Sequence, residues 1–163
     1  MKVVIFCGGQ GARLREETEF RPKPMVMIGP KPVLWHIMKA YAHYGCKEFV
    51  LCLGYKGEMI REYFDEKANK EKDWSVTLAD TGEHAEKGAR LKRIQKYIDG
   101  DTFMVTYGDG VADINITALL AFHQTHGKMA TVTGVRPRSA FGEIRFEKDG
   151  TVTKFIEKPQ FSA

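Results

Sequence analysis

The sequence predicts an α/β fold in which a mainly parallel, mixed sheet carries helices on both faces. Short apolar runs, typical of buried strands, alternate five times with longer segments that have helical spacing. The first apolar run ends in glycines, as a buried parallel strand entering a tight loop does. A chain of 163 residues is long enough for a real hydrophobic core. We therefore expect one domain over residues 1–163.

The first half of the chain predicts two strands and two helices. Its strands are continuous apolar runs that end at glycines. Its first helix has a proline near the start and a glycine as a stop. In order, these elements are a strand at 2–6, a helix at 32–45, a strand at 48–53 and a helix at 57–70.

The second half continues the alternation and ends in a β-hairpin. The hairpin is indicated by Asp149-Gly150, a dipeptide typical of tight turns, between two runs rich in strand-forming residues. The predicted elements are strands at 75–80, 102–107 and 129–135, helices at 91–98 and 115–127, and the hairpin at 142–158.

The composition favours a soluble cytoplasmic protein. No apolar run approaches the roughly 18 residues of a membrane span, and the N-terminal MKVVIF is too short for a signal peptide. The three cysteines have no zinc-finger spacing, and their odd number argues against a disulfide framework. Lys and Arg are spread over the whole chain despite a net charge of +4. We expect neither a nucleic acid nor a membrane as a partner.

A glycine-rich, basic stretch follows the first strand: residues 7–24 read CGGQGARLREETEFRPKP. The dinucleotide fingerprint would need a glycine where Leu14 stands, and the P-loop would need a Gly-Lys pair that does not follow these glycines at the required spacing. What remains is a loop whose backbone N–H groups approach an anion, with Arg13 and Lys23 to neutralise it. The prolines beside Lys23 would hold its backbone stiffly. The alternative is a plain turn with solvated basic residues.

Two further loops are expected at the same edge of the sheet, after Asp80 and after Tyr107. The second begins Gly-Asp-Gly, and a carboxylate at Asp109 is well placed for a hard cation that carries phosphates. An ordinary Asp-Gly turn is the alternative. Asp113 either joins this site or lies near a helix start.

The stretch GGQGARLREETEFRPKPM resembles the signature of the sugar nucleotidyltransferase family, G-x-G-T-R-L-x-x-x-T-x-x-x-P-K-P. The likeness extends over nearly the whole chain, and the segments WHIM and TYGDGVAD resemble the cytidylyl branch. The resemblance implies a Rossmann-like fold and the reaction of CTP with α-D-glucose 1-phosphate, which yields CDP-glucose and pyrophosphate. It also implies direct in-line attack on the α-phosphorus, without a covalent enzyme intermediate.

The resemblance also implies roles for individual residues. Asp109 would be the Mg²⁺ ligand and, with Arg13 and Lys23, would form the catalytic set. Glu157 and Lys158 would reach the sugar and its phosphate, although an ordinary strand end explains them equally simply. The nucleotide would be bound by Gly8, Gly9, Gly11, Ala12, Arg13, Lys23, Gly88, Arg90 and Gly108.

The sequence departs from the family pattern at several positions. Ala12 stands where the family has Thr, and Lys87 and Ala89 replace a Thr and a Gly in the nucleotide loop. The chain also ends at Ala163, before a second metal-binding aspartate of the family. Two alternatives therefore stay open: a nucleotide-binding but catalytically incompetent fragment, or a transferase for another base, dTTP or UTP. A homo-oligomer is expected if the family's full-length surfaces are present.

Overall fold

The computed structural model describes residues 1–9, 20–65 and 73–160. The chain divides into two compact units, Met1–Leu120 and Ala121–Ala163. Each unit is described by itself.

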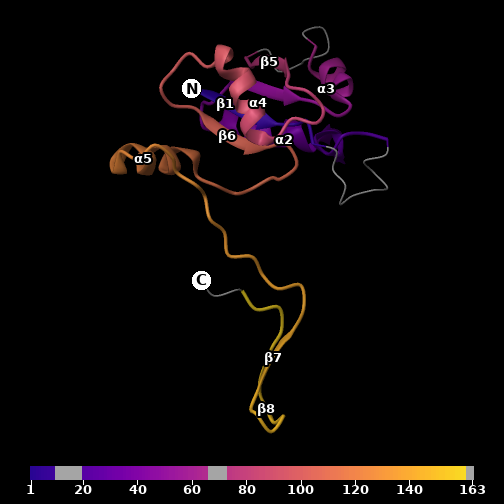
Figure 1. The fold of residues 1–163 in the computed structure, drawn as a ribbon, viewed down its shortest axis with the longest axis vertical. Coiled ribbons are helices and arrows are strands. Elements are labelled where there is room, and N and C mark those ends of the chain that lie inside the picture. Colours follow the sequence, from indigo (N-terminus) through magenta and orange to yellow (C-terminus); the bar gives the residue numbers. More distant parts are fainter. Residues whose placement is uncertain (10–19, 66–72, 161–163) are drawn as a thin grey trace. The chain divides into compact units, whose positions relative to one another are not determined.

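The first unit is built on a four-stranded sheet whose strands all run parallel. The strands are β1 (Lys2–Phe6), β4 (Glu48–Leu53), β5 (Ser75–Asp80) and β6 (Met104–Tyr107). Their order is β5-β4-β1-β6, so β1 and β4 are central (Figure 1). In register, Val4 lies opposite Val50 on one side and Val105 on the other. The predicted parallel sheet is confirmed.

Helices cover both faces of this sheet, as predicted. On one face, α2 (Val33–His43) and α3 (Gly57–Phe64) pack with alternate strand residues in the larger core, which includes Val3, Ile5, Leu34, Phe49, Leu51 and Ile60. On the other face, Ile94 of α4 (Lys87–Ile94) packs on Val4 and Val50, and α4 lies over the strands in the view of Figure 1. Strands buried on both faces need apolar residues at every position, which explains their continuous apolar runs.

Two local predictions for this unit need correction. The helix expected over 91–98 begins earlier, at Lys87, and passes into a 3-10 turn, η2 (Gln95–Tyr97). Its first turn was missed because it contains a glycine and no large apolar side chain. A short hairpin was also missed: β2 (Met27–Ile28) pairs with β3 (Lys31–Pro32), and Gly29 takes a φ of +60° in the turn.

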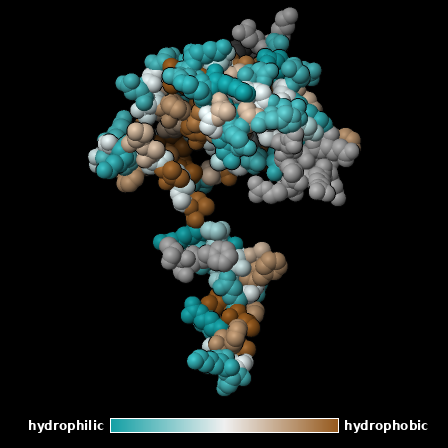
Figure 2. Space-filling model, viewed as in Figure 1, coloured by the Kyte–Doolittle hydropathy of each residue, from teal (hydrophilic) through white to brown (hydrophobic). Residues whose placement is uncertain are grey.

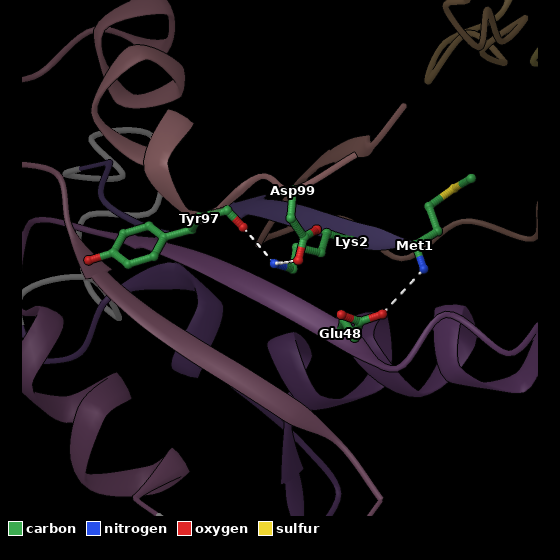
Figure 3. A network of polar contacts seen from close by, with 5 residues as sticks. All are labelled: Met1, Lys2, Glu48, Tyr97 and Asp99. Carbon is green, nitrogen blue, oxygen red and sulfur yellow. Dashed lines mark hydrogen bonds and ion pairs between the residues drawn. The ribbon is translucent and has the colours of Figure 1, made fainter. Parts of the chain in front are cut away.

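A polar network anchors the start of β1 (Figure 3). The Lys2 ammonium donates to the carbonyl of Tyr97 and to Asp99 Oδ2, each at 2.7 Å. The N-terminal ammonium of Met1 lies 3.3 Å from Glu48 Oε1 at the start of β4. These contacts join the first two strands and the segment after α4 at the edge opposite the strands' carboxyl ends.

Helix α5 (Ile116–His126) crosses the boundary between the two units and ends at Gly127, whose φ is +62°. In the second unit, β7 (Glu143–Phe146) and β8 (Val152–Ile156) form the predicted antiparallel hairpin. Gly150 takes a φ of +87° in its turn, and Asp149 Oδ1 accepts from the Thr151 N–H at 3.0 Å.

The strand predicted over 129–135 is wrong. The described residues there form no strand and pair with none of the described strands. Met129 is fully exposed, and Val132 is 88% exposed. An apolar run forms a strand only where a neighbouring ladder and a covered face stabilise it, and this segment has neither. Figure 2 shows apolar side chains, in brown, standing among polar ones in this unit.

No helix among the described residues is long and apolar enough to cross a membrane.

Candidate functional site

A hollow of about 460 Å³ opens at the carboxyl ends of the parallel strands in the first unit. It forms there because the strands end together and their following loops diverge from one edge. The three loops that the sequence placed at this edge all contribute to it. Its walls are Phe6, Cys7, Gly8, Gly9, Lys23, Pro24, Glu83, His84, Ala85, Glu86, Lys87, Arg90, Tyr107 and Asp109.

The structure brings together five of the predicted site residues around this hollow: Gly8, Gly9, Lys23, Arg90 and Asp109. Gly108 precedes Asp109 and packs against Phe6 and Pro24, and neither Gly108 nor Gly88 lines the hollow. Gly11, Ala12 and Arg13 lie outside the described residues. Glu157 and Lys158 belong to the second unit.

Lys23 and Asp109 form an ion pair in the hollow. The Lys23 Nζ lies 3.9 Å from Asp109 Oδ2, and their side chains are 13% and 45% exposed. Lys23 opens a 3-10 turn, η1 (Lys23–Met25), which is closed by a 2.8 Å hydrogen bond from the Met25 N–H to the Pro22 carbonyl. The prolines on either side of Lys23 fix the local backbone, so its ammonium is held beside Asp109.

Gly108 allows the Asp109 loop to approach β1 closely. Its N–H donates to the Phe6 carbonyl at 3.0 Å. A Cβ at this position would lie 3.0 Å from both the Phe6 carbonyl oxygen and Pro24 Cγ, and 3.1 Å from Cys7 Sγ. The glycine that the sequence suggested as a nucleotide contact therefore has a packing role, which places Asp109 against the Lys23 turn.

Arg90 is buried beneath the glycine loop, with only 4% of its surface exposed. Its Nη1 donates to the Leu53 carbonyl at 3.0 Å and to Thr81 Oγ1 at 2.7 Å. Its Nη2 donates to the carbonyls of Gly8 at 3.0 Å and Glu83 at 3.1 Å. One guanidinium thus joins the ends of β1, β4 and β5.

Thr81 and Gly82 shape the loop after β5, and the sequence reasoning assigned them no role. The Thr81 hydroxyl donates to the Leu53 carbonyl at 2.6 Å, and its backbone N–H donates to the same oxygen at 3.1 Å. Gly82 takes a φ of +84°, and its N–H donates to Asp80 Oδ1 at 2.9 Å. Arg93 adds a hydrogen bond to the Thr81 carbonyl. The Asp-Thr-Gly run is the signal that could have revealed this turn.

The two thiols near the hollow are held in the neutral form. Burial raises the pKa of Cys7 well above its usual value and raises that of Cys52 to about 11. Neither thiol offers a thiolate nucleophile near neutral pH, because the thiolate is the reactive form.

Asp109 is the residue that the sequence suggested as a metal ligand. The described residues contain no group of three or more His, Cys, Asp or Glu side chains that could hold a metal ion. A half-exposed single carboxylate still suits Mg²⁺, which keeps several waters and binds through one or two carboxylates together with substrate phosphates.

In the second unit, Lys158 takes a φ of +45°, which is uncommon for a residue other than glycine. The segment beside it is pinned by a 2.7 Å hydrogen bond from the Ser139 N–H to the Pro159 carbonyl, and by one from the Gln160 side chain to the Arg136 carbonyl.

Comparisons with known proteins show which family the chain resembles. A family model described as nucleotidyl transferase matches residues 2–163. The chain is 46% identical to glucose-1-phosphate cytidylyltransferase of Salmonella typhi, over 98% of this chain and 70% of that protein. It is 45% identical to a probable glucose-1-phosphate cytidylyltransferase of Bacillus subtilis, over 97% and 69%. Catalytic subunit beta of the mannose-1-phosphate guanylyltransferase of Drosophila pseudoobscura is 32% identical, over 98% and 44%.

Solved structures share the fold. HddC from Yersinia pseudotuberculosis, complexed with GMP-PN, aligns with a TM-score of 0.64 and 24% identity, over 98% of this chain and 70% of that one. A UDP-glucose pyrophosphorylase complexed with UDP-glucose aligns with a TM-score of 0.65 and 19% identity, over 98% and 69%. At these identities the likeness establishes the nucleotide-diphospho-sugar transferase fold and nothing finer.

Proposed function

Because the chain belongs to the nucleotidyl transferase family, we propose that it transfers the cytidylyl group of CTP to α-D-glucose 1-phosphate, giving CDP-glucose and pyrophosphate. The observation that supports this most is the Lys23–Asp109 pair in the hollow at the strand ends. It offers a cation for phosphate oxygens beside a carboxylate for a metal. The choice of CTP and glucose rests on the relatives at 45–46% identity.

The proposed reaction is a single in-line displacement. A phosphate oxygen of glucose 1-phosphate forms a bond to the α-phosphorus of CTP, and the bond from that phosphorus to the bridging oxygen breaks. Pyrophosphate leaves with the electron pair. Catalysis of this kind depends on positioning and on neutralising charge, and it needs no nucleophile from the protein.

Within this proposal, different residues at the hollow bind the triphosphate, neutralise its charge and hold the metal ion. Backbone N–H groups of the glycine loop bind the triphosphate, and the Lys23 ammonium neutralises phosphate oxygens. Asp109 would hold a Mg²⁺ ion together with phosphate oxygens, and that ion would supply further charge neutralisation. Glu157 and Lys158 are proposed to bind the sugar and its phosphate.

One observation favours a second candidate, a transferase for another base. Lys87, one of the positions where the chain departs from the family pattern, lines the hollow. The Lys87 Nζ also lies 6.0 Å from the centroid of the Tyr107 ring, which lines the same hollow. A changed wall of this kind would alter which base the hollow accepts.

The test is pyrophosphate release from CTP, dTTP, UTP and GTP, each supplied with glucose 1-phosphate and Mg²⁺. We expect release with CTP, and its loss in Asp109→Asn. Release with another nucleotide would support the second candidate. A protein that binds CTP but releases no pyrophosphate with any nucleotide would contradict catalysis and leave a nucleotide-binding fragment.

Lys23→Gln provides an independent check of the charge-neutralising role. Removing one fixed cation should lower kcat/KM by roughly 30- to 1,000-fold, which corresponds to about 2–4 kcal/mol of transition-state stabilisation. Lys92→Gln is the matched control, because the Lys92 Nζ bonds to Gln95 Oε1 on the exposed side of α4. Equal kinetics for the two variants would contradict the role of Lys23.

A further inference from the structure

We infer that Arg90 is a positioning residue that orients the Gly8–Gly9 peptide so that its N–H faces the phosphates of the bound nucleotide. The inference rests on the proposed function in one respect, namely that the hollow receives a nucleotide triphosphate. In this inference Arg90 does not contact the ligand directly; it affects binding through its hydrogen bond to the Gly8 carbonyl.

The first step is the orientation of one peptide. The Gly8 carbonyl accepts from Arg90 Nη2 at 3.0 Å and from the Tyr55 N–H at 3.2 Å. In a trans peptide the C=O and the following N–H point in opposite directions. The N–H of Gly9 is therefore directed away from Arg90. Gly9 is exposed, and a Cβ there would meet nothing within 4 Å, so this N–H lies on the open side of the loop.

The second step concerns the alternative orientation. If this peptide turned over, the Gly8 carbonyl oxygen would face the hollow and repel phosphate oxygens. Glycine permits such a rotation at low cost, since it has no Cβ to resist it. The orientation of this peptide therefore depends on fixed donors to the Gly8 carbonyl, and Arg90 supplies the charged one beside the Tyr55 N–H.

The third step is the rigidity of the donor. The other three bonds of the guanidinium go to the Leu53 carbonyl, Thr81 Oγ1 and the Glu83 carbonyl, which belong to or follow β4 and β5. The planar fork is thus anchored to the sheet edge. A lysine carries its donors on a single atom and cannot span acceptors from three strand ends.

The fourth step is the space that the guanidinium occupies. A Cβ at Gly8 would lie 2.2 Å from Arg90 Nη1. A Cβ at Gly54 would lie 2.8 Å from the same nitrogen and 2.7 Å from the Gly8 carbonyl oxygen. Real Cβ atoms do not approach so closely, so the fork fits only between two glycines. Gly54 does not line the hollow, so a substitution there reaches the ligand through Arg90 and the Gly8 backbone, whose Cα would lie 2.8 Å from the added Cβ.

The test uses inorganic tripolyphosphate as the probe, with CTP as a second ligand, and calorimetry on Arg90→Lys, Gly54→Ala and their combination. Loss of one hydrogen bond to a charged group should weaken tripolyphosphate binding by about tenfold to a hundredfold. The double variant should bind no more weakly than the weaker single variant, because both changes act on one peptide. Lys92→Gln is the control, and circular dichroism establishes that each variant is folded.

Two further readouts separate positioning from general structural damage. In kinetics, we expect the loss to appear in the KM for CTP, with kcat at saturating CTP within a few-fold of the unsubstituted protein. In the unsubstituted protein, the Gly9 amide proton should move downfield in NMR spectra during tripolyphosphate titration. This second measurement needs no variant, so it tests whether the Gly9 N–H faces the phosphates even if Gly54→Ala does not fold, and Arg90→Lys then tests the part played by Arg90.

The outcomes divide clearly. Unchanged tripolyphosphate affinity in folded Arg90→Lys, additive losses, or binding without a Gly9 shift would each overturn the inference, as would a protein that binds neither probe. If tripolyphosphate shifts Gly9 while no nucleotide yields pyrophosphate, the inference stands and only the proposed function fails.

Discussion

At the scale of single residues, the site depends on positions where a side chain is absent. Gly108 brings the Asp109 loop against the Phe6 carbonyl and Pro24, and Gly8 with Gly54 leaves room for the Arg90 guanidinium. The charged groups are therefore placed by backbone contact. Such contacts cannot relax by a side-chain rotation, so small additions at these positions are expected to have large effects.

Gly108→Ala tests this expectation. The added methyl group would lie 3.0 Å from a backbone carbonyl oxygen and from Pro24 Cγ, and neither can move away easily. We expect a loss of about 1–3 kcal/mol in the free energy of unfolding, measured by urea denaturation. Gly110→Ala is the matched control, because a Cβ there meets nothing within 4 Å, and it should stay within about 0.5 kcal/mol. Equal stabilities would contradict the packing role.

At the scale of elements, the strands were predictable and several connections were not. Val3, Val4 and Ile5 are buried on both faces of the sheet, so the sequence carries an uninterrupted apolar signal. The start of α4 carries no such signal, since the one buried side chain of its first turn is the charged Arg90. The segment at 129–135 has strand-like composition but pairs with no strand of the described part of the chain, and composition alone cannot reveal a missing partner.

The candidate site was predictable to a similar degree. The glycine loop, Lys23 and Asp109 follow strands or prolines, and their convergence follows from the parallel sheet. The hydrogen bonds of Arg90 could not be predicted, because three of their four acceptors are backbone carbonyls from segments far apart in the sequence. Every residue has a backbone carbonyl, so the residue types in the sequence do not indicate which carbonyls accept these hydrogen bonds.

The contact between β1 and the segment after α4 predicts a pH dependence of stability. The hydrogen bond from Lys2 holds the pKa of the exposed Asp99 carboxyl below its usual value. A carboxyl whose folded-state pKa is depressed stabilises the fold above its unfolded pKa, near 4, and loses that contribution as the pH falls through the folded-state pKa.

Lys2→Met should therefore be less stable than the unsubstituted protein at pH 7, and the difference should shrink below about pH 4. Urea denaturation across this range measures it. A difference that stays constant from pH 7 to pH 3 would show that the hydrogen bond to the Tyr97 carbonyl, and not the ion pair, carries the effect.

At the scale of the whole molecule, the two units differ in how they are stabilised. The first has a core on each face of its sheet. The second shows apolar side chains at its surface, with Phe146 66% exposed and Phe155 64% exposed (Figure 2). Burial of apolar surface is the main favourable term in folding. Because these side chains are exposed, the second unit gains less stabilisation from apolar burial than the first.

Amide hydrogen exchange followed by mass spectrometry should reflect this difference. We expect the amides of β1 and β4 to exchange only through global unfolding, and those of β7 and β8 to exchange sooner through local opening. Equal protection of the hairpin and the central strands would mean that the hairpin's apolar side chains are covered in solution.

The buried thiols of Cys7 and Cys52 allow opening of the central sheet to be measured by chemical labelling. Cys7 directly follows β1, and Cys52 lies near the end of β4. Both side chains are fully buried, and their raised pKa values leave almost no thiolate to react. An alkylating reagent can therefore modify them only while the sheet is open. The rate of iodoacetamide labelling would then measure how often the sheet opens. A ligand that binds in the hollow beside Cys7 should lower the labelling rate as the fraction of ligand-bound protein rises.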